Sequence, residues 1–186
     1  KFFDHHQTHQ TYSEAMNISH KDFLSISLDG GGEELSTVVT VVSGNQRKII
    51  KKIPWPNSMG HFYSYFTGFL GFRMLEGEYK MMGLAPLGKP VYKKIIFDNF
   101  LKLDRKGGYL FNYNLCDYHA ALEDNFSPKV IKLLGKNRNK DEEFNQRHRD
   151  IAASVQEVYE DTLEHMLSWA KSRYPSTKNL FLSGGC

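Results

Sequence analysis

Hydrophobic and polar side chains alternate along the segment that begins near residue 22, which is the period of a β-strand. One face of this strand carries Leu24, Ile26 and Leu28, and the other carries Phe23, Ser25 and Ser27. The pattern predicts strands at about residues 22–28, 36–42 and 46–53, with glycine-containing turns at residues 30–32 and 43–45. Connections this short require antiparallel neighbours, so three antiparallel strands are expected.

Helical spacing characterises most of the remaining chain. Helices are expected at about residues 4–17, 61–70, 76–84, 90–103, 127–134 and 141–173, and an apolar strand follows at residues 180–182. Ser58 is a candidate N-cap for the second helix. That helix bears an aromatic stripe that we interpret as core, formed by Phe62, Tyr63, Phe66, Phe69 and Leu70.

Residues from about 72 to 140 are less regular, and we interpret them as a helical insertion. A small basic loop within this stretch is expected to face solvent, with Lys136, Arg138 and Lys140 as its charged residues. Three antiparallel strands, then helices, then one more strand are typical of the RNase H-like half of actin, Hsp70 and sugar-kinase ATPases. The predicted fold class is therefore α/β, a fragment of an actin/Hsp70-like ATPase fold flanked by helices.

Composition narrows the classes of function. The 186 residues carry 24 basic and 21 acidic side chains, a balance that does not indicate a nucleic-acid partner. Two cysteines are too few for a disulfide framework, so a reducing, cytoplasmic location is expected. No apolar run approaches the length of a membrane span, so no membrane partner is expected either.

Histidines near the start of the chain form a candidate metal site. His5 and His9 are four residues apart, so on a helix their imidazoles share one face, whereas His6 lies roughly 100° away. Alone, such a pair is more often a solvated polar face than a metal site. Gln7 stands where a zincin-type hydrolase would have a glutamate, so the motif lacks a general base. The other histidines are interpreted as structural: His61, His119, His148 and His165.

Glycines follow two of the predicted strands, and glycine turns of this kind hold phosphate oxygens with their N–H groups in many α/β proteins. The first turn contains Asp29, Gly30, Gly31 and Gly32, and the second contains Gly184 and Gly185. An isolated Asp-Gly-Gly is weak support, since it also suits an ordinary hairpin. Asp29 itself could contact a metal, act through water, or cap the turn. Two such turns suggest two loops that face a single ligand.

Six motifs in order resemble the nodulation-type carbamoyltransferase family. They are His5-His-Gln-Thr-His9, Leu28-Asp-Gly-Gly-Gly-Glu33, Pro56-Asn-Ser-Met-Gly-His-Phe-Tyr63, Leu70-Gly-Phe72, Gly77-Glu-Tyr-Lys-Met-Met-Gly-Leu-Ala-Pro86 and Leu182-Ser-Gly-Gly-Cys186. The resemblance implies transfer of a carbamoyl group from carbamoyl phosphate, through an ATP-derived carbamoyl adenylate, to a hydroxyl of a small molecule or sugar. The catalytic half of this family is also similar to tRNA threonylcarbamoylation proteins.

The resemblance assigns roles residue by residue. It implies a divalent metal, with iron as the expected ion, on His5 and His9, and a further aspartate ligand beyond residue 186. ATP and carbamoyl phosphate are the expected substrates. Glu78 and Lys80, which alone would be a solvated charge pair, become candidate contacts to nucleotide or carbamoyl phosphate. No catalytic base and no oligomeric state are assigned.

The resemblance also implies a division of the chain. Residues 1–20 would be the tail of a first ATPase-like half, and residues 21–186 would be the second, RNase H-like half. The N-terminal strands and a C-terminal YrdC-like domain are expected outside this stretch, so the 186 residues alone are expected to be inactive.

Two alternatives stay open from the residues. A tRNA threonylcarbamoylation-type protein shares the His-x-x-x-His motif, but its phosphate turn is usually Ser-Gly-Gly-Asn and it lacks the Gly-Glu-Tyr-Lys segment. The other alternative is a non-catalytic module that binds a nucleotide or a metal.

Overall fold

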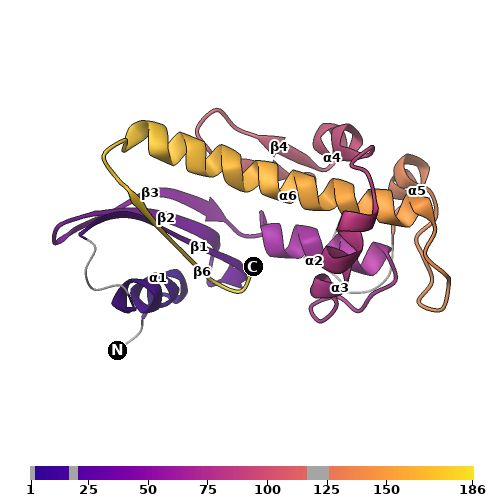
Figure 1. Cartoon of the computed structure of the whole chain (residues 1–186), viewed down its shortest axis with the longest axis horizontal. Helices are drawn as coiled ribbons and strands as arrows, with labels where there is room; N and C mark the ends of the chain where they lie inside the picture. The colour runs from indigo at the N-terminus through magenta and orange to yellow at the C-terminus, as the bar shows by residue number, and fades with distance from the viewer. Residues whose placement is uncertain (1–2, 17–20, 117–125) are drawn as a thin grey trace. The chain divides into compact units, whose positions relative to one another are not determined.

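The computed structural model describes residues 3–16, 21–116 and 126–186 of the chain (Figure 1). The chain divides into two compact units. The first comprises Lys1–Gly60, Leu103–Tyr109 and Glu164–Cys186, and the second comprises His61–Lys102 and Leu110–Leu163. The described part of the predicted insertion at residues 72–140 lies in the second unit, except for Leu103–Tyr109.

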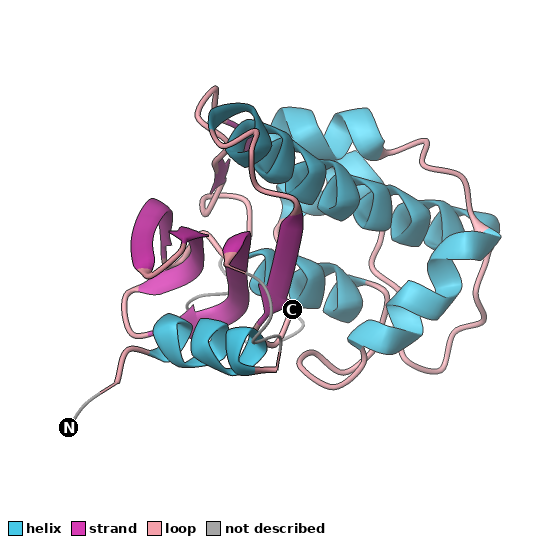
Figure 2. Cartoon of the chain, turned by 60° about the vertical axis from the view of Figure 1, so that its left-hand side comes forward, coloured by secondary structure: helices cyan, strands magenta, loops and turns pink. Residues whose placement is uncertain are grey.

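A four-stranded mixed sheet forms the centre of the first unit. Its order is β3-β2-β1-β6, with β1 at Asp22–Gly32, β2 at Leu35–Ser43, β3 at Gln46–Pro54 and β6 at Asn179–Ser183. Strands β1, β2 and β3 pair antiparallel, and β6 pairs parallel with β1. The prediction of three antiparallel strands and one further strand is confirmed. Helix α1, His5–Ala15, contacts β1, β2 and β6 (Figure 2).

The predicted turn at residues 30–32 is wrong, because β1 continues to Gly32. Gly32 pairs with Leu35, and the register shifts between Leu28 and Gly32 as in a β-bulge. The reversal takes place at Glu33 and Glu34 instead, and Glu33 has a left-handed φ of 51°. Glycine suits a bulged strand as well as a turn, so its presence alone does not locate the reversal.

Helices account for most of the rest, and the predicted ones exist with shifted ends. They are α2 at Met59–Phe69, α3 at Glu78–Leu84, η1 (3₁₀) at Ala85–Leu87, α4 at Lys93–Asn99, α5 at Pro128–Leu134 and α6 at Gln146–Arg173. Helix α6 begins five residues later than the predicted 141, because the Asn145 side chain accepts the His148 N–H at 3.1 Å and caps the helix. Ser58 donates its hydroxyl to the Asp29 carbonyl at 3.1 Å. Across the described residues, every helix is too short or too polar to cross a membrane.

A short hairpin was not predicted. Strands β4, Leu101–Leu103, and β5, Tyr109–Phe111, pair where the predicted fourth helix was expected to end. Within the first unit, Asp104 organises the connection: its Oδ1 accepts the N–H groups of Lys106 and Gly108 at 2.6 and 2.8 Å. Its Oδ2 accepts the Lys51 ammonium at 3.2 Å. This turn depends on side-chain hydrogen bonds that hydrophobic periodicity does not reveal.

Four of the five residues of the predicted aromatic stripe are core, whereas Tyr63 is only half-buried. Phe62, Phe66, Phe69 and Leu70 are all buried within the second unit. Phe62 stacks on Phe111 with ring centroids 5.3 Å apart, within the range of favourable aromatic pairs.

Arg138 contradicts the prediction of a solvated basic loop, because only 7% of its surface is exposed. Its guanidinium donates to the Leu70 carbonyl and to the Lys140 carbonyl, each at 3.0 Å. It also lies 3.8 Å from the centroid of the Phe144 ring, a cation–π contact. Lys136 and Lys140 are exposed, so the expectation holds for them. The planar guanidinium presents several donors in a fixed geometry, so it bridges the two carbonyls while its face lies on the Phe144 ring.

We predict that Arg138→Ala lowers the free energy of unfolding by about 2–3 kcal/mol, because the buried Leu70 carbonyl and the Lys140 carbonyl lose a charged donor. Lys136→Ala, in the same loop, should change it by less than about 0.5 kcal/mol. Urea denaturation of both variants measures the difference. Equal effects would contradict the structural role assigned to Arg138.

Candidate functional site

Helix α1 presents two histidines to one carboxylate. Asp4 caps the helix by accepting the Gln7 N–H at 2.8 Å, which fixes the first turn. The Nε2 atoms of His5 and His9 lie 2.9 and 3.0 Å from the same Asp29 oxygen, Oδ2. Their rings meet edge to face, with centroids 4.7 Å apart. The structure thus joins the two predicted metal ligands to a predicted phosphate-turn residue.

Asp29 stands where β1 begins its bulge, and its second oxygen is also engaged. Oδ1 accepts the Gly30 N–H at 2.7 Å, so this glycine amide serves Asp29 here. Burial by itself raises the pKa of the carboxyl. The hydrogen bonds from His5 and Gly30 and the charges of His5 and His9 outweigh that cost and hold the pKa below its ordinary value of 3.8. Asp29 is therefore an anionic acceptor.

The three residues have the donor set of a metal site. One ligand atom from each of His5, His9 and Asp29 lies within 4.8 Å of the others. Two imidazole nitrogens and one carboxylate oxygen suit iron(II) and zinc, and the two-histidine, one-carboxylate set with open positions is typical of non-haem iron. About a third of each histidine side chain is exposed, so a substrate or a further ligand has access.

The glycines of β1 make room for this cluster. A Cβ on Gly32 would lie only 2.2 Å from Cδ2 of His5, so a side chain there would displace the imidazole. The His5 ring therefore packs directly against the backbone of Gly32. This close approach, rather than a turn, explains the glycine at this position.

The second glycine loop reaches the same place. Strand β6 is the parallel neighbour of β1, so the carboxyl ends of both strands meet at one edge of the sheet. Gly184 has a φ of +108°, and a Cβ there would be 1.8 Å from the Leu28 carbonyl oxygen. A Cβ on Gly185 would be 3.2 Å from Oδ1 of Asp29. The two loops predicted to face one ligand are therefore adjacent.

Comparison with known proteins shows the family of the chain. A family model described as the carbamoyltransferase N-terminus matches residues 1–186. The chain belongs to this family.

Individual relatives show the same match. An uncharacterised protein of Synechocystis, sll1178, is 35% identical over 99% of this chain and 30% of its own length. Nodulation protein NolNO of Sinorhizobium fredii is 32% identical over 99% of the chain and 25% of its own length. Nodulation protein NolO of Bradyrhizobium diazoefficiens is 34% identical over 98% of the chain and 31% of its own length. The chain spans between a quarter and a third of these relatives.

Glu78 and Lys80, which were predicted to contact nucleotide or carbamoyl phosphate, lie in the second unit. Oε1 of Glu78 accepts the Ser64 hydroxyl at 2.5 Å and the Leu75 N–H at 2.7 Å. Leu75 has a left-handed φ of 65°, so Glu78 stabilises a strained turn before α3. Lys80 is exposed, with its ammonium 5.8 Å from the centroid of the Tyr79 ring. Their contact with nucleotide stays a prediction.

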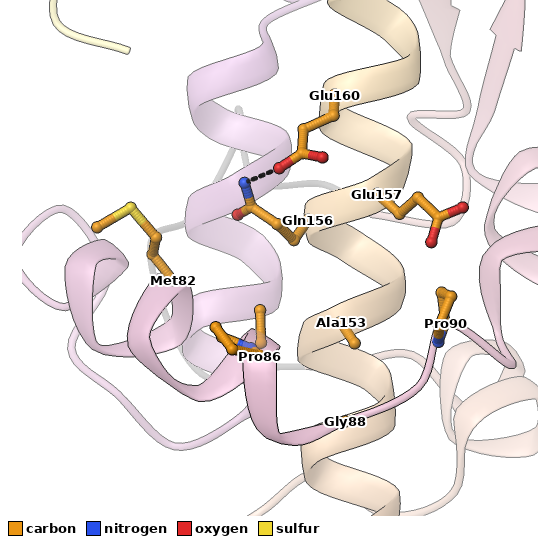
Figure 3. Close-up of a pocket in the computed structure, with 9 residues that line it drawn as sticks. Met82, Pro86, Gly88, Pro90, Ala153, Gln156, Glu157 and Glu160 are labelled. Atoms are coloured by element: carbon orange, nitrogen blue, oxygen red, sulfur yellow. Dashed lines mark hydrogen bonds between the residues drawn. The ribbon is translucent and has the colours of Figure 1, made fainter.

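The second unit also holds a cavity of about 430 Å³. Figure 3 shows its lining, which comprises Met82, Ala85, Pro86, Gly88, Pro90, Ala153, Gln156, Glu157 and Glu160. Three of these come from the predicted motif at residues 77–86, but Glu78 and Lys80 are not among them. Tyr63 donates to Gln156 at 2.7 Å, and Gln156 donates to Glu160 at 2.7 Å. Burial raises the pKa of the Tyr63 phenol, and the charges of Glu160 and Glu78 raise it further, so Tyr63 remains a donor.

Four further histidines were predicted to be structural. His148 is buried, and Nε2 of His165 lies 2.7 Å from the Asp104 carbonyl. His119 lies outside the described residues.

The sequence left Asp29 among metal, water and turn-capping roles, so its contact with both His5 and His9 was not predicted. The burial of His6 and Gln10 against the sheet was not predicted either, although Ser25 and Ser27 on one strand face were a signal that could have indicated it.

We predict that Gly32→Ala weakens metal binding by at least about tenfold, because the new methyl group collides with the His5 ring and moves one ligand. Isothermal titration with Co²⁺ measures the affinity. Gly83→Ala is the matched control, since a Cβ there would meet nothing within 4 Å. Wild-type affinity in Gly32→Ala would contradict the proposed seating of His5.

Proposed function

We propose that the protein is an ATP-dependent O-carbamoyltransferase and that this chain supplies part of its catalytic domain. In this proposal a carbamoyl group passes from carbamoyl phosphate to a carbamoyl adenylate and then to a hydroxyl of a small molecule or sugar. The observation that carries it is the convergence of His5, His9 and Asp29 with the glycine loops of β1 and β6 in a member of the carbamoyltransferase family.

The metal site in this proposal is built from His5, His9 and Asp29, with iron as the expected ion. When bound, a divalent ion supplies Lewis-acid polarisation of a carbonyl or hydroxyl oxygen. A further aspartate ligand from beyond residue 186 stays an expectation of this proposal.

The glycine loops have a positional role. The N–H groups of Gly31, Gly184 and Gly185 would hold phosphate oxygens beside Asp29, while Gly30 joins them only if Asp29 releases its amide. Fixed donors of this kind stabilise developing charge without reorganisation. In the transfer step the acceptor oxygen forms a bond to the carbamoyl carbon, the bond from that carbon to the adenylate phosphate oxygen breaks, and AMP leaves with the electron pair. The acceptor proton passes to solvent.

Family membership supports this proposal over a tRNA threonylcarbamoylation-type protein. The wider assignments belong to the same proposal: an actin/Hsp70-like ATPase fold, a cytoplasmic location, Glu78 and Lys80 as nucleotide contacts, and no nucleic-acid or membrane partner.

We predict that the full-length protein forms AMP from ATP only when carbamoyl phosphate is present, because adenylate formation requires both. Chromatography of nucleotides from paired reactions, with and without carbamoyl phosphate, measures this dependence. ADP formed without carbamoyl phosphate would indicate a kinase-type relative instead. Absence of both pyrophosphate and any nucleotide product would favour a non-catalytic binding module.

We also predict that His5→Ala and His9→Ala each reduce bound metal at least about tenfold, because each removes one of three ligands. Gln7→Ala, an exposed position on the same helix, is the control and should retain wild-type metal content. Metal content is measured by mass spectrometry of the purified full-length protein. Equal metal content in the three variants would remove the site from α1.

A further inference from the structure

We propose that His6 and Gln10 are positioning residues for the metal site: they hold α1 in the one register on the sheet that brings His5 and His9 to Asp29. This inference deepens the proposed function and rests on its metal site. The argument starts from what α1 buries. Among the residues of this helix, the buried ones are His6 and Gln10, and both are polar.

His6 is bonded on both ring nitrogens. It has no exposed surface, its Nδ1 lies 2.9 Å from the Ser27 hydroxyl, and its Nε2 lies 3.1 Å from the Leu35 carbonyl. A carbonyl only accepts, so Nε2 donates to Leu35, and in a neutral imidazole Nδ1 then accepts from the Ser27 hydroxyl. The ring is thus tied to β1 through Ser27 and to the start of β2 through Leu35.

Gln10 repeats the arrangement one turn along. It is 2% exposed, and its amide nitrogen donates to the carbonyls of Ser25 and Val38 at 3.1 and 3.0 Å. Its amide oxygen accepts the Thr40 hydroxyl at 2.9 Å. Both donor hydrogens and the acceptor of the amide are therefore used, which fixes the orientation of the side chain.

Helix geometry links the buried pair, His6 and Gln10, to the outer pair, His5 and His9. His6 and Gln10 have the same four-residue spacing as His5 and His9, and each follows its counterpart by one residue, roughly 100° around the helix. A rotation of α1 that moved the outer pair away from Asp29 would also break the hydrogen bonds of His6 and Gln10 to the sheet.

A polar contact suits this task better than an apolar one. Apolar packing is non-directional, so a helix held by leucines alone could shift or rotate at small cost. Hydrogen bonds weaken steeply with angle, and a buried polar group without its partner is costly. The network therefore penalises every register except the one in which the metal ligands converge.

The test uses two matched pairs of substitutions in the full-length protein, with Co²⁺ as the probe. Gln10→Met removes the buried amide, and Gln7→Met makes the same change at an exposed position of α1. Thr40→Val removes the hydroxyl that bonds Gln10. Thr37→Val removes a comparable buried hydroxyl on β2, which lies 2.9 Å from the Tyr109 hydroxyl and does not face α1.

We expect Gln10→Met to weaken Co²⁺ binding about tenfold or more and to change the visible spectrum of bound Co²⁺. Thr40→Val should weaken binding by a smaller factor, while Gln7→Met and Thr37→Val keep the wild-type affinity and spectrum. A merely structural role would instead lower the melting temperature in Thr40→Val and Thr37→Val alike, with the Co²⁺ spectrum unchanged in both. That outcome would overturn the inference, as would wild-type binding by Gln10→Met.

A metal-free measurement separates this inference from the metal site itself. The coupling between His9 and Asp29 is obtained from a double-mutant cycle of His9→Gln and Asp29→Asn in urea, with a chelator present. We expect this coupling to fall by half or more in the Thr40→Val background and to persist in the Thr37→Val background. Failure of the wild-type protein to bind Co²⁺ would refute the metal site, and the cycle would then decide the positioning role alone. Equal coupling in both backgrounds would overturn it.

Discussion

The carboxylate of Asp29 is the constraint on which the first unit depends. One of its oxygens meets both histidines of α1, and the other accepts the amide of Gly30. A single anionic group therefore connects a helix to the bulged, glycine-rich end of a strand. The ionised carboxylate is an anionic ligand for a cation, and the two imidazoles can join it as ligands once their Nε2 atoms release the protons that they now donate to Asp29.

Close approach of backbone and side chain makes this convergence possible. Gly32 leaves space for the His5 ring, and Gly184 allows the end of β6 to touch the carbonyl of Leu28. At each position the absence of a side chain leaves room for another group, which is the His5 ring at Gly32 and the Leu28 carbonyl at Gly184. The glycine-rich segments thus help to support the cluster of His5, His9 and Asp29 and are also candidates for phosphate binding.

The second unit is stabilised by different interactions. Its core is aromatic, with Phe62 and Phe66 fully buried, and its polar groups mainly secure turns. Glu78 fastens the turn before α3, and Arg138 bridges two carbonyls beside Phe144. Charged residues that looked solvated in the sequence are therefore structural here, because long side chains can reach backbone groups that local periodicity does not reveal.

The sequence by itself determined most of the elements and the family resemblance. Alternation around Leu24 and Ile26 gave β1, helical spacing gave α2 and α6, and the motif at residues 5–9 placed two histidines on one helix face. These features follow from period and spacing, which are local. Tertiary structure decided what the residues meet: that Asp29 joins His5 and His9, that His6 and Gln10 point into the sheet, and that Gly32 lies in a strand. Such contacts depend on strand register and on the rotation of α1, which are set by groups distant in the chain and carry no local signal.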